Sequence, residues 1–385
     1  VHSGPESLRH EFDAVVSRQD LFDTYLPAFE ALVKEAKVES VMGAYNRVYG
    51  QPACASDLLT DILRNQWGFA GHFVSDCGAL SDFHLHHKVT DTAPESAALA
   101  VKHGCDVNCG AVYLHILTAI QEGLLTEDDI TPCVERLMAT RMKLGMFDKD
   151  CPYDAIPYAV NDCAEHRAVA QEAARRSQVL LKNDGLLPLD VDKLSSIAVI
   201  GPNADSQEVL KGNYNGTASE YVTILEGIHR ICDGKARVFY SEGCPLYRDR
   251  SEGLALPGDR LGEAVAVARE ADVVVLCLGL DPRIEGEEGD ASNEYGAGDK
   301  AHLNLPGLQQ KLLEKVVAVG KPTILVLSSG SALAVNFAQA HCSAIVQNWY
   351  AGSYGGQAVA ELLFGKFSPS GRLPVTFYKS LDDLP

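Results

Sequence analysis

Short apolar runs alternate with helix-like segments along most of the 385-residue chain, and this alternation constrains the fold more than any other feature. Parallel strands need crossover connections of about a dozen residues or more, and a helix usually supplies them. The sequence therefore predicts α/β units whose strands pair in parallel.

The first region, residues 1–148, contains three short strand patterns. We expect strands at 40–44, 72–75 and 106–108. Helical periodicity predicts helices at 21–36, 57–66, 94–103, 114–122 and 126–145. Three strands cannot close a (β/α)₈ barrel, which typically needs about 250 residues.

A connector at 149–164 contains prolines and mixed polarity, which is typical of an inter-domain boundary. The second region, residues 165–385, begins with a predicted helix at 165–177. Its strands are continuously apolar and are expected at 179–183, 196–201, 236–240, 273–278, 323–327 and 344–348. Such strands indicate a sheet covered on both faces.

The formal net charge is −19, from 33 Lys and Arg against 52 Asp and Glu. Phosphate contacts need a basic surface, so the sequence predicts neither nucleic acid nor an anionic membrane as partner. Apolar runs stay below the about 20 residues that span a bilayer. We expect a soluble protein, with a periplasmic or secreted location favoured over a cytoplasmic one, and a homo-oligomer is left open.

The eleven cysteines are scattered and odd in number, unlike those of a small disulfide scaffold. Cys105 with Cys109, or Cys54 with Cys77, could bridge or hold a metal. Without a second Cys-x-x-Cys, we expect buried or loop thiols instead.

Neither a metal nor an organic cofactor is predicted. The His-x-His-His segment at 84–87 lacks a carboxylate at fixed spacing and is interpreted as a loop lining a binding site. Gly201-Pro202-Asn203 follows a strand, but it lacks the Gly-x-Gly-x-x-Gly pattern, and Pro202 occupies the tight turn.

One carboxylate, Asp76, lies at the carboxyl end of the predicted 72–75 strand, where barrel enzymes keep their chemistry. An Asp at this position can equally cap a helix or a loop, so its surroundings decide its role. Asp106, at the start of the predicted 106–108 strand, is a further candidate for substrate binding. A long acidic loop with Glu285, Glu287 and Glu288 follows the 273–278 strand.

The surroundings of Asp76 follow the pattern Met-x-x-Tyr-Asn, Gly-x-Pro, Gly-Phe and Val-Ser-Asp. The matching residues are Met42, Tyr45, Asn46, Gly50, Pro52, Gly68, Phe69, Val74, Ser75 and Asp76. This segment resembles the nucleophile region of family 3 glycoside hydrolases. Segments 181–185, 201–204 and 370–377 resemble the α/β sandwich domain of the same family.

The resemblance implies an α/β fold with the C-terminal part of a (β/α)₈ (TIM-type) barrel followed by an α/β/α sandwich domain. The earlier barrel units, with a Lys-His-Phe segment that binds sugar hydroxyls, would precede Val1. We therefore expect an N-terminally truncated fragment with an exposed apolar edge and little or no activity of its own.

Family members cleave glycosidic bonds with two carboxyl groups and retain the anomeric configuration. The resemblance makes Asp76 the nucleophile. A Glu-x-Glu-Gly pattern, followed by Asp-Arg, points to Glu287 as acid/base, with Glu288 as its nearest rival. The match is imperfect, because Glu288 replaces the Gly and Asp299-Lys300 replaces the Asp-Arg after an insertion-like segment.

Five further residues are implied as parts of the sugar site. Tyr45 would orient the nucleophile and Met42 would line the site. Arg47 would lie at the rim, with Cys77 and His86 on the loops that follow Asp76.

Cys77 stands where many glucosidases of the family carry Trp, and this favours the xylosidase branch. We expect release of β-linked xylose from the non-reducing end of xylo-oligosaccharides or aryl xylosides. The alternatives are a β-glucosidase and an inactive carbohydrate-binding fragment. A branch that acts on N-acetylhexosaminides through a His-Asp dyad is less favoured, because of the Glu-rich loop.

Overall fold

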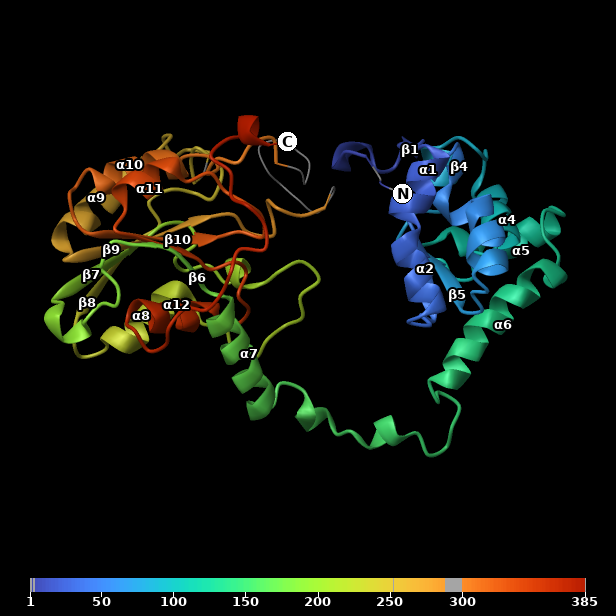
Figure 1. Ribbon diagram of the computed structural model, residues 1–385, viewed down its shortest axis with the longest axis horizontal. Helices are drawn as coiled ribbons and strands as arrows, with labels where there is room; N and C mark the ends of the chain where they lie inside the picture. The colour runs from blue at the N-terminus through green and yellow to red at the C-terminus, as the bar shows by residue number, and fades with distance from the viewer. Residues whose placement is uncertain (1, 3, 252, 288–299, 385) are drawn as a thin grey trace. The chain divides into compact units, whose positions relative to one another are not determined.

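The computed structural model describes residues 2, 4–251, 253–287 and 300–384. The chain forms two compact units, Val1–Pro157 and Tyr158–Pro385 (Figure 1). Among the described residues, no helix combines the length and apolar character needed to cross a membrane.

The second unit is built on a six-stranded sheet in the order β6-β11-β10-β9-β7-β8. The strands are β6 (Val179–Asn183), β7 (Ser196–Ile200), β8 (Arg237–Ser241), β9 (Val273–Gly279), β10 (Thr323–Ser328) and β11 (Ala344–Gln347). Every residue of β7, β9, β10 and β11 is buried, which explains their continuous apolar character. All six predicted strands are confirmed to within one residue at each end. Only β6 runs antiparallel to its neighbour.

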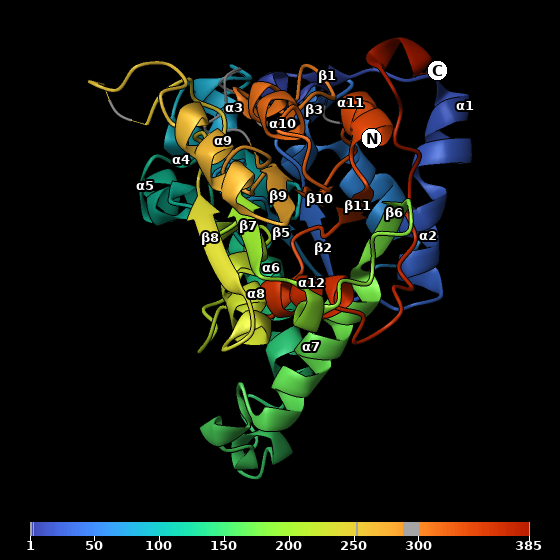
Figure 2. The same ribbon diagram turned by 90° about the vertical axis from the view of Figure 1, so that its left-hand side faces the viewer.

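Helices cover both faces of this sheet (Figure 2). On one face lie α9 (Leu261–Glu270), α10 (Gln309–Val317) and α11 (Asn336–His341), and their buried side chains form one core. On the other face lie α8 (Ile224–Cys232) and α12 (Gly355–Leu363), which form a second core. The predicted helix at 165–177 is confirmed as α7 (Ala164–Ser177).

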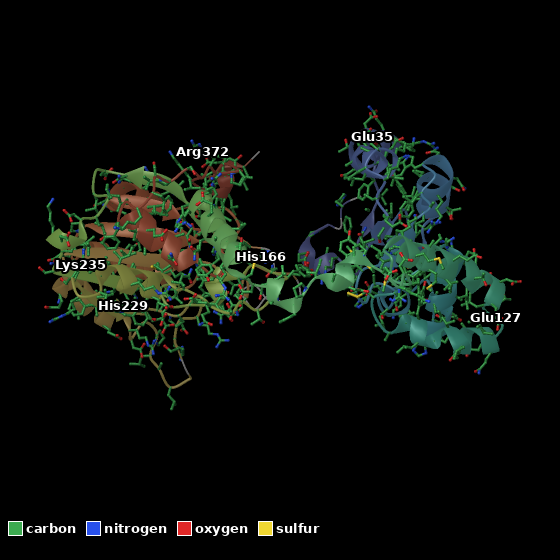
Figure 3. The ribbon with its side chains drawn as sticks, turned by 90° about the horizontal axis from the view of Figure 1, so that it is seen from below. Glu35, Glu127, His166, His229, Lys235 and Arg372 are labelled. Atoms are coloured by element: carbon green, nitrogen blue, oxygen red, sulfur yellow. A yellow bond between two sulfur atoms is a disulfide. The ribbon has the colours of Figure 1, made fainter. Side chains whose placement is uncertain are left out.

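Two glycines allow α8 and α12 to approach closely. A Cβ on Gly227 would lie 2.4 Å from the Gly356 carbonyl oxygen, so only glycine fits at this crossing. His229 and Lys235 lie at the edge of this unit (Figure 3). Lys235 pairs there with Asp192 at 3.0 Å.

The first unit contains two small sheets. Strand β2 (Ser40–Gly43) pairs in parallel with β5 (His72–Ser75), and a single bridge joins Val74 to Val107. The expected third strand at 106–108 is therefore reduced to one bridge. The second sheet has the order β1-β3-β4, with β1 (Asp13–Ala14), β3 (Arg47–Val48) and β4 (Gln51–Pro52).

Most of the predicted helices of the first unit are present. The α-helices are α1 (Arg18–Asp20), α2 (Pro27–Lys34), α3 (Asp82–Leu85), α4 (Ala93–Lys102), α5 (Ile116–Gln121) and α6 (Glu127–Lys143). Capping boxes at Thr92 and Thr126 begin α4 and α6. The expected helix at 21–36 is divided into a π-helical segment, η2 (Leu21–Tyr25), and α2, which begins at Pro27.

The remaining helical segments are short. A second π-helical segment is η4 (Leu59–Gln66). The 3₁₀ turns are η1 (Glu6–Leu8), η3 (Ala53–Ala55), η5 (Val112–His115), η6 (Pro152–Ala155), η7 (Tyr158–Val160), η8 (Val191–Lys193), η9 (Glu208–Leu210) and η10 (Leu381–Asp383).

Apolar side chains and a cavity lie beside strand β2. Among the described residues it pairs with β5 alone. A cavity of about 490 Å³ borders it and is lined by apolar side chains that include Phe29, Leu32, Met42 and Trp67.

Candidate active site

Asp76 directly follows β5, and hydrogen bonds fix its position. Its backbone N–H donates to the Gly43 carbonyl at the end of β2 (2.9 Å). Its Oδ1 accepts a hydrogen bond from the backbone N–H of Cys77 (2.7 Å). The half-buried carboxylate is thereby oriented at the carboxyl end of two parallel strands.

A disulfide between Cys77 and Cys109 connects the residue after Asp76 to the segment after the Val107 bridge. The Gly78 N–H donates to the Cys109 carbonyl (2.7 Å), and the Cys109 N–H donates to Ser75 Oγ (3.1 Å). The expectation of free thiols is wrong for this pair, because strand pairing brings their Cα atoms to 4.3 Å across a sequence separation of 32. Cys54 and Cys105 are free and buried.

Tyr45 supports the same loop. Its hydroxyl donates to the Cys77 carbonyl (2.9 Å). Its ring lies 4.8 Å from the His10 ring and 4.7 Å from the Arg9 guanidinium. The hydroxyl of Tyr45 therefore holds the residue next to Asp76, while His10 and Arg9 pack against its ring.

The other residues predicted for the sugar site lie in the same unit. Met42 is 60% exposed on β2. Arg47 donates from Nη2 to the Glu11 carbonyl (3.0 Å). His86 lies with its ring nitrogens 3.8 Å from carboxylate oxygens of both Glu11 and Asp82.

Sequence reasoning missed the pair formed by His10 and Asp82. His10 Nδ1 lies 2.9 Å from Asp82 Oδ2, and the Asp82 side chain is almost fully buried. Burial raises the pKa of Asp82, and the hydrogen bond with His10 opposes this shift. The signal in the sequence that could have indicated this pair is the position of Asp82, just before the His-rich segment at 84–87. Among the described residues, no group of three or more His, Cys, Asp or Glu is arranged to hold a metal ion.

Asp106 has a structural role, so its interpretation as a substrate ligand is wrong. Its side chain is fully buried and accepts from Arg64 Nη2 (2.9 Å) and from Arg136 Nε (2.9 Å). The Phe73 N–H also donates to it (2.8 Å). Burial, followed by the charge of Arg136, lowers the pKa of Arg64. The carboxylate thus holds two cations and β5 together.

In the second unit, a buried aspartate sets the path of the acidic loop after β9. Asp281 is 1% exposed and accepts from the Arg283 N–H (2.8 Å) and from Arg283 Nε (2.9 Å). Its carbonyl accepts from the N–H groups of Ile284 and Glu285, both at 3.1 Å. These hydrogen bonds hold the beginning of the loop in a turn around Asp281.

The glutamates of this loop have different surroundings. Glu285 Oε2 accepts from the Gly330 N–H (2.8 Å) and from the Tyr350 hydroxyl. Burial, followed by the Glu285 carboxylate, strongly raises the pKa of Tyr350. Glu287 Oε1 instead accepts from the hydroxyl of Tyr214 (2.7 Å), a residue that is 90% exposed. Glu285 anchors the loop, whereas Glu287 contacts the exposed Tyr214.

Parts of the predicted acid/base pattern lie outside the described residues. These are Glu288 and Asp299. Lys300 is described, and its Nζ donates to the Ala332 carbonyl (2.7 Å). Burial lowers the pKa of Lys300.

A carboxylate at the end of parallel strands, together with a second acidic loop at a strand end, is typical of α/β enzymes that act through acid–base or nucleophilic chemistry. The family model "Glycosyl hydrolase family 3 N terminal domain" matches residues 3–140, and "Glycosyl hydrolase family 3 C-terminal domain" matches residues 178–385. The chain belongs to glycosyl hydrolase family 3.

Curated relatives carry xylosidase names. Beta-D-xylosidase 1 of Arabidopsis thaliana is 41% identical over 379 residues, which are 96% of this chain and 46% of the relative. Xylan 1,4-beta-xylosidase of Xylanibacter ruminicola is 32% identical over 530 residues and is matched over 61% of its length. The chain spans about half the length of the curated relatives it matches.

Solved structures agree in fold. The GH3 exo-beta-xylosidase XlnD, in complex with a xylobiose aziridine activity-based probe, aligns with a TM-score of 0.83 and 31% identity. The alignment covers 95% of this chain and 46% of that one. The beta-glucosidase from Listeria innocua in complex with glucose aligns with a TM-score of 0.78 and 30% identity, over 96% and 48% of the two chains.

Proposed function

We propose that this chain belongs to a retaining, exo-acting β-xylosidase. Such an enzyme releases xylose from the non-reducing end of xylo-oligosaccharides or aryl xylosides. The observation that carries the proposal is Asp76, held at the end of β5 and followed by the cross-linked Cys77. The names of the curated relatives and of the XlnD structure support the choice of xylose.

In this proposal residues 1–148 form the last units of a TIM-type barrel, residues 149–164 are the linker, and residues 165–385 form the sandwich domain that carries the acid/base loop. Two observations support the barrel assignment. Strand β2 has an apolar cavity beside it, and the relatives are about twice as long as this chain. The earlier barrel units would come from a longer protein.

The proposed reaction has two steps. Asp76 attacks the anomeric carbon while Glu287, as general acid, protonates the leaving oxygen. Glu287 then takes a proton from water, which attacks the glycosyl ester and releases xylose. The two carboxyl groups would lie about 5–5.5 Å apart around the sugar.

Glu287 is preferred over Glu285 because Glu285 is already occupied as the anchor of its loop, with Gly330 and Tyr350. Glu288 remains the rival. For the sugar site we propose Tyr45 as the support of the nucleophile loop, with Met42, Arg47, Cys77 and His86 around it.

Rates on aryl β-xyloside and aryl β-glucoside test the proposal, measured with the full-length protein that contains this chain. We expect the xyloside to be the better substrate and Asp76→Asn to lower kcat at least 1,000-fold. Near-normal turnover by Asp76→Asn would refute the assignment. Equal turnover by this chain alone and by the full-length protein would refute the barrel assignment.

A β-glucosidase is the second candidate. The likeness in fold to the beta-glucosidase from Listeria innocua supports it. A glucoside rate above the xyloside rate would favour this candidate. Xylose binding without turnover would favour a carbohydrate-binding fragment.

A further inference from the structure

A pocket of about 370 Å³ lies in the second unit, between the segment after β8 and the beginning of the loop after β9. The residues that matter for its chemistry are Glu242, Tyr247, Arg248, Arg250, Arg283 and Ile284. Its volume is within the range of about 300–1,000 Å³ that is common for small-molecule sites. We call it the arginine pocket.

The arginine pocket is cationic in a chain whose net charge is −19. Three guanidinium groups line it against one carboxylate, Glu242, which pairs with Arg260 outside the lining. Among the described residues Arg248 has no acidic group within ion-pair distance, whereas Arg250 pairs with Asp249 at 3.0 Å. Arg248 thus offers a charge that no described carboxylate pairs with, and five N–H donors.

Arg283 adds a second oriented cation. The Arg283 side chain is 59% exposed, while its partner Asp281 is 1% exposed and accepts from Nε and Nη2. The buried carboxylate therefore fixes the Arg283 fork, and the remaining N–H groups of that fork can serve a ligand. Planar forks of this kind recognise carboxylates with two parallel hydrogen bonds.

The pocket wall is partly apolar and well anchored. Arg248 lies over the Tyr247 ring, 5.6 Å from its centroid, and Ile284 is buried. The Leu246 carbonyl accepts from Gln309 Nε2 (2.6 Å), and the Gly258 N–H donates to the Asp249 carbonyl (3.0 Å). An aromatic ring beside guanidinium groups, one of them fixed by Asp281, suits a ligand that is both a sugar and an acid.

We propose that the arginine pocket binds the carboxylate of a uronic acid. This inference rests on the proposed function in one respect only: Arg283 lies on the same loop as the proposed acid/base Glu287, four residues before it. The uronic acid is either a free sugar acid or a residue attached to the xylan chain. The carboxylate chemistry is the same in both cases.

Isothermal titration calorimetry with the full chain tests this. The probes are D-glucuronate, neutral D-glucose, sulfate, and xylotriose with and without a glucuronic acid substituent. We expect D-glucuronate to bind with a Kd of about 1 mM and D-glucose at least about tenfold more weakly. Arg248→Gln should weaken glucuronate binding about tenfold or more, and added salt should weaken it too.

The matched control is Arg269→Gln, which removes the same charge from the exposed side of α9, away from the pocket. It should leave glucuronate binding unchanged, and both variants should keep the unfolding temperature of the parent. Tighter binding of the substituted xylotriose than of glucuronate identifies the attached acid, and equal binding identifies the free acid.

The inference is overturned if glucose binds as tightly as glucuronate, or if Arg248→Gln binds glucuronate normally. Sulfate binding as tight as that of glucuronate also overturns it, because the site is then a plain anion site. Equilibrium binding needs no turnover. Repeating the titration with Asp76→Asn therefore separates a failure of this inference from a failure of the proposed function.

Discussion

Replacing Asp106 by Asn removes the charge that holds two guanidinium groups in the interior of the first unit. The fully buried carboxylate accepts from Arg64, from Arg136 and from the Phe73 N–H, so that Asp106→Asn leaves the two cations facing a neutral amide. Breaking a buried ion pair by removal of one partner costs about 3–5 kcal/mol. In a unit of this size each kcal/mol shifts Tm by about 2–4 °C, so Tm should fall by about 6–20 °C.

The two tryptophans allow this effect to be assigned to one unit. Trp67 lies in the first unit and Trp349 in the second. In a Trp349→Phe background, fluorescence during thermal unfolding follows the first unit alone. The matched control is Asp23→Asn, an exposed carboxylate in η2, which should change stability by less than about 0.5 kcal/mol. A loss below about 1 kcal/mol for Asp106→Asn would refute the reasoning that this carboxylate is essential for packing.

Three further predictions concern other residues. Burial lowers the pKa of His87 from 6.5 to about 4. Between these two pH values the folded state therefore binds fewer protons than the unfolded state. The free energy of unfolding should be highest above pH 6.5 and fall by about 3 kcal/mol toward pH 4. Urea titrations at several pH values should show that the free energy of unfolding depends less on pH in His87→Gln than in the parent. An equal pH dependence in the two proteins contradicts this prediction. Cys109→Ser opens the disulfide and should cost about 3–4 kcal/mol, measured by the urea midpoint; no change contradicts a formed bond. Tyr214→Phe removes the hydrogen bond to Glu287 and should lower kcat about tenfold and move the alkaline limb of its pH profile, where the general acid loses its proton, with KM little changed. Identical profiles would exclude a positioning role.

The sheet of the second unit could be predicted from the sequence because its central strands are buried on both faces and leave continuous apolar runs. The direction of β6 could not be predicted. An edge strand has the same composition whether it is parallel or antiparallel to its neighbour, and its pairing with β11 depends on residues more than 150 positions away.

The candidate site was predictable only in part. The position of Asp76 follows from the strand pattern before it, as the structure confirms for β5. The Cys77–Cys109 disulfide and the burial of Asp106 depend on how segments about 30 residues apart pack, which spacing does not reveal. The distinction between Glu285 and Glu287 likewise depends on Gly330 and Tyr350, which are distant in sequence.

The most direct test of the mechanism is mass spectrometry of the full-length protein, quenched during turnover of an aryl 2-deoxy-2-fluoro-β-xyloside. This probe slows breakdown of the covalent intermediate. We predict one fluoroxylosyl group on the peptide that contains Asp76, and none in Asp76→Asn. An adduct on another carboxylate, or normal hydrolysis of the natural β-xyloside with inversion at the anomeric carbon, would contradict the account.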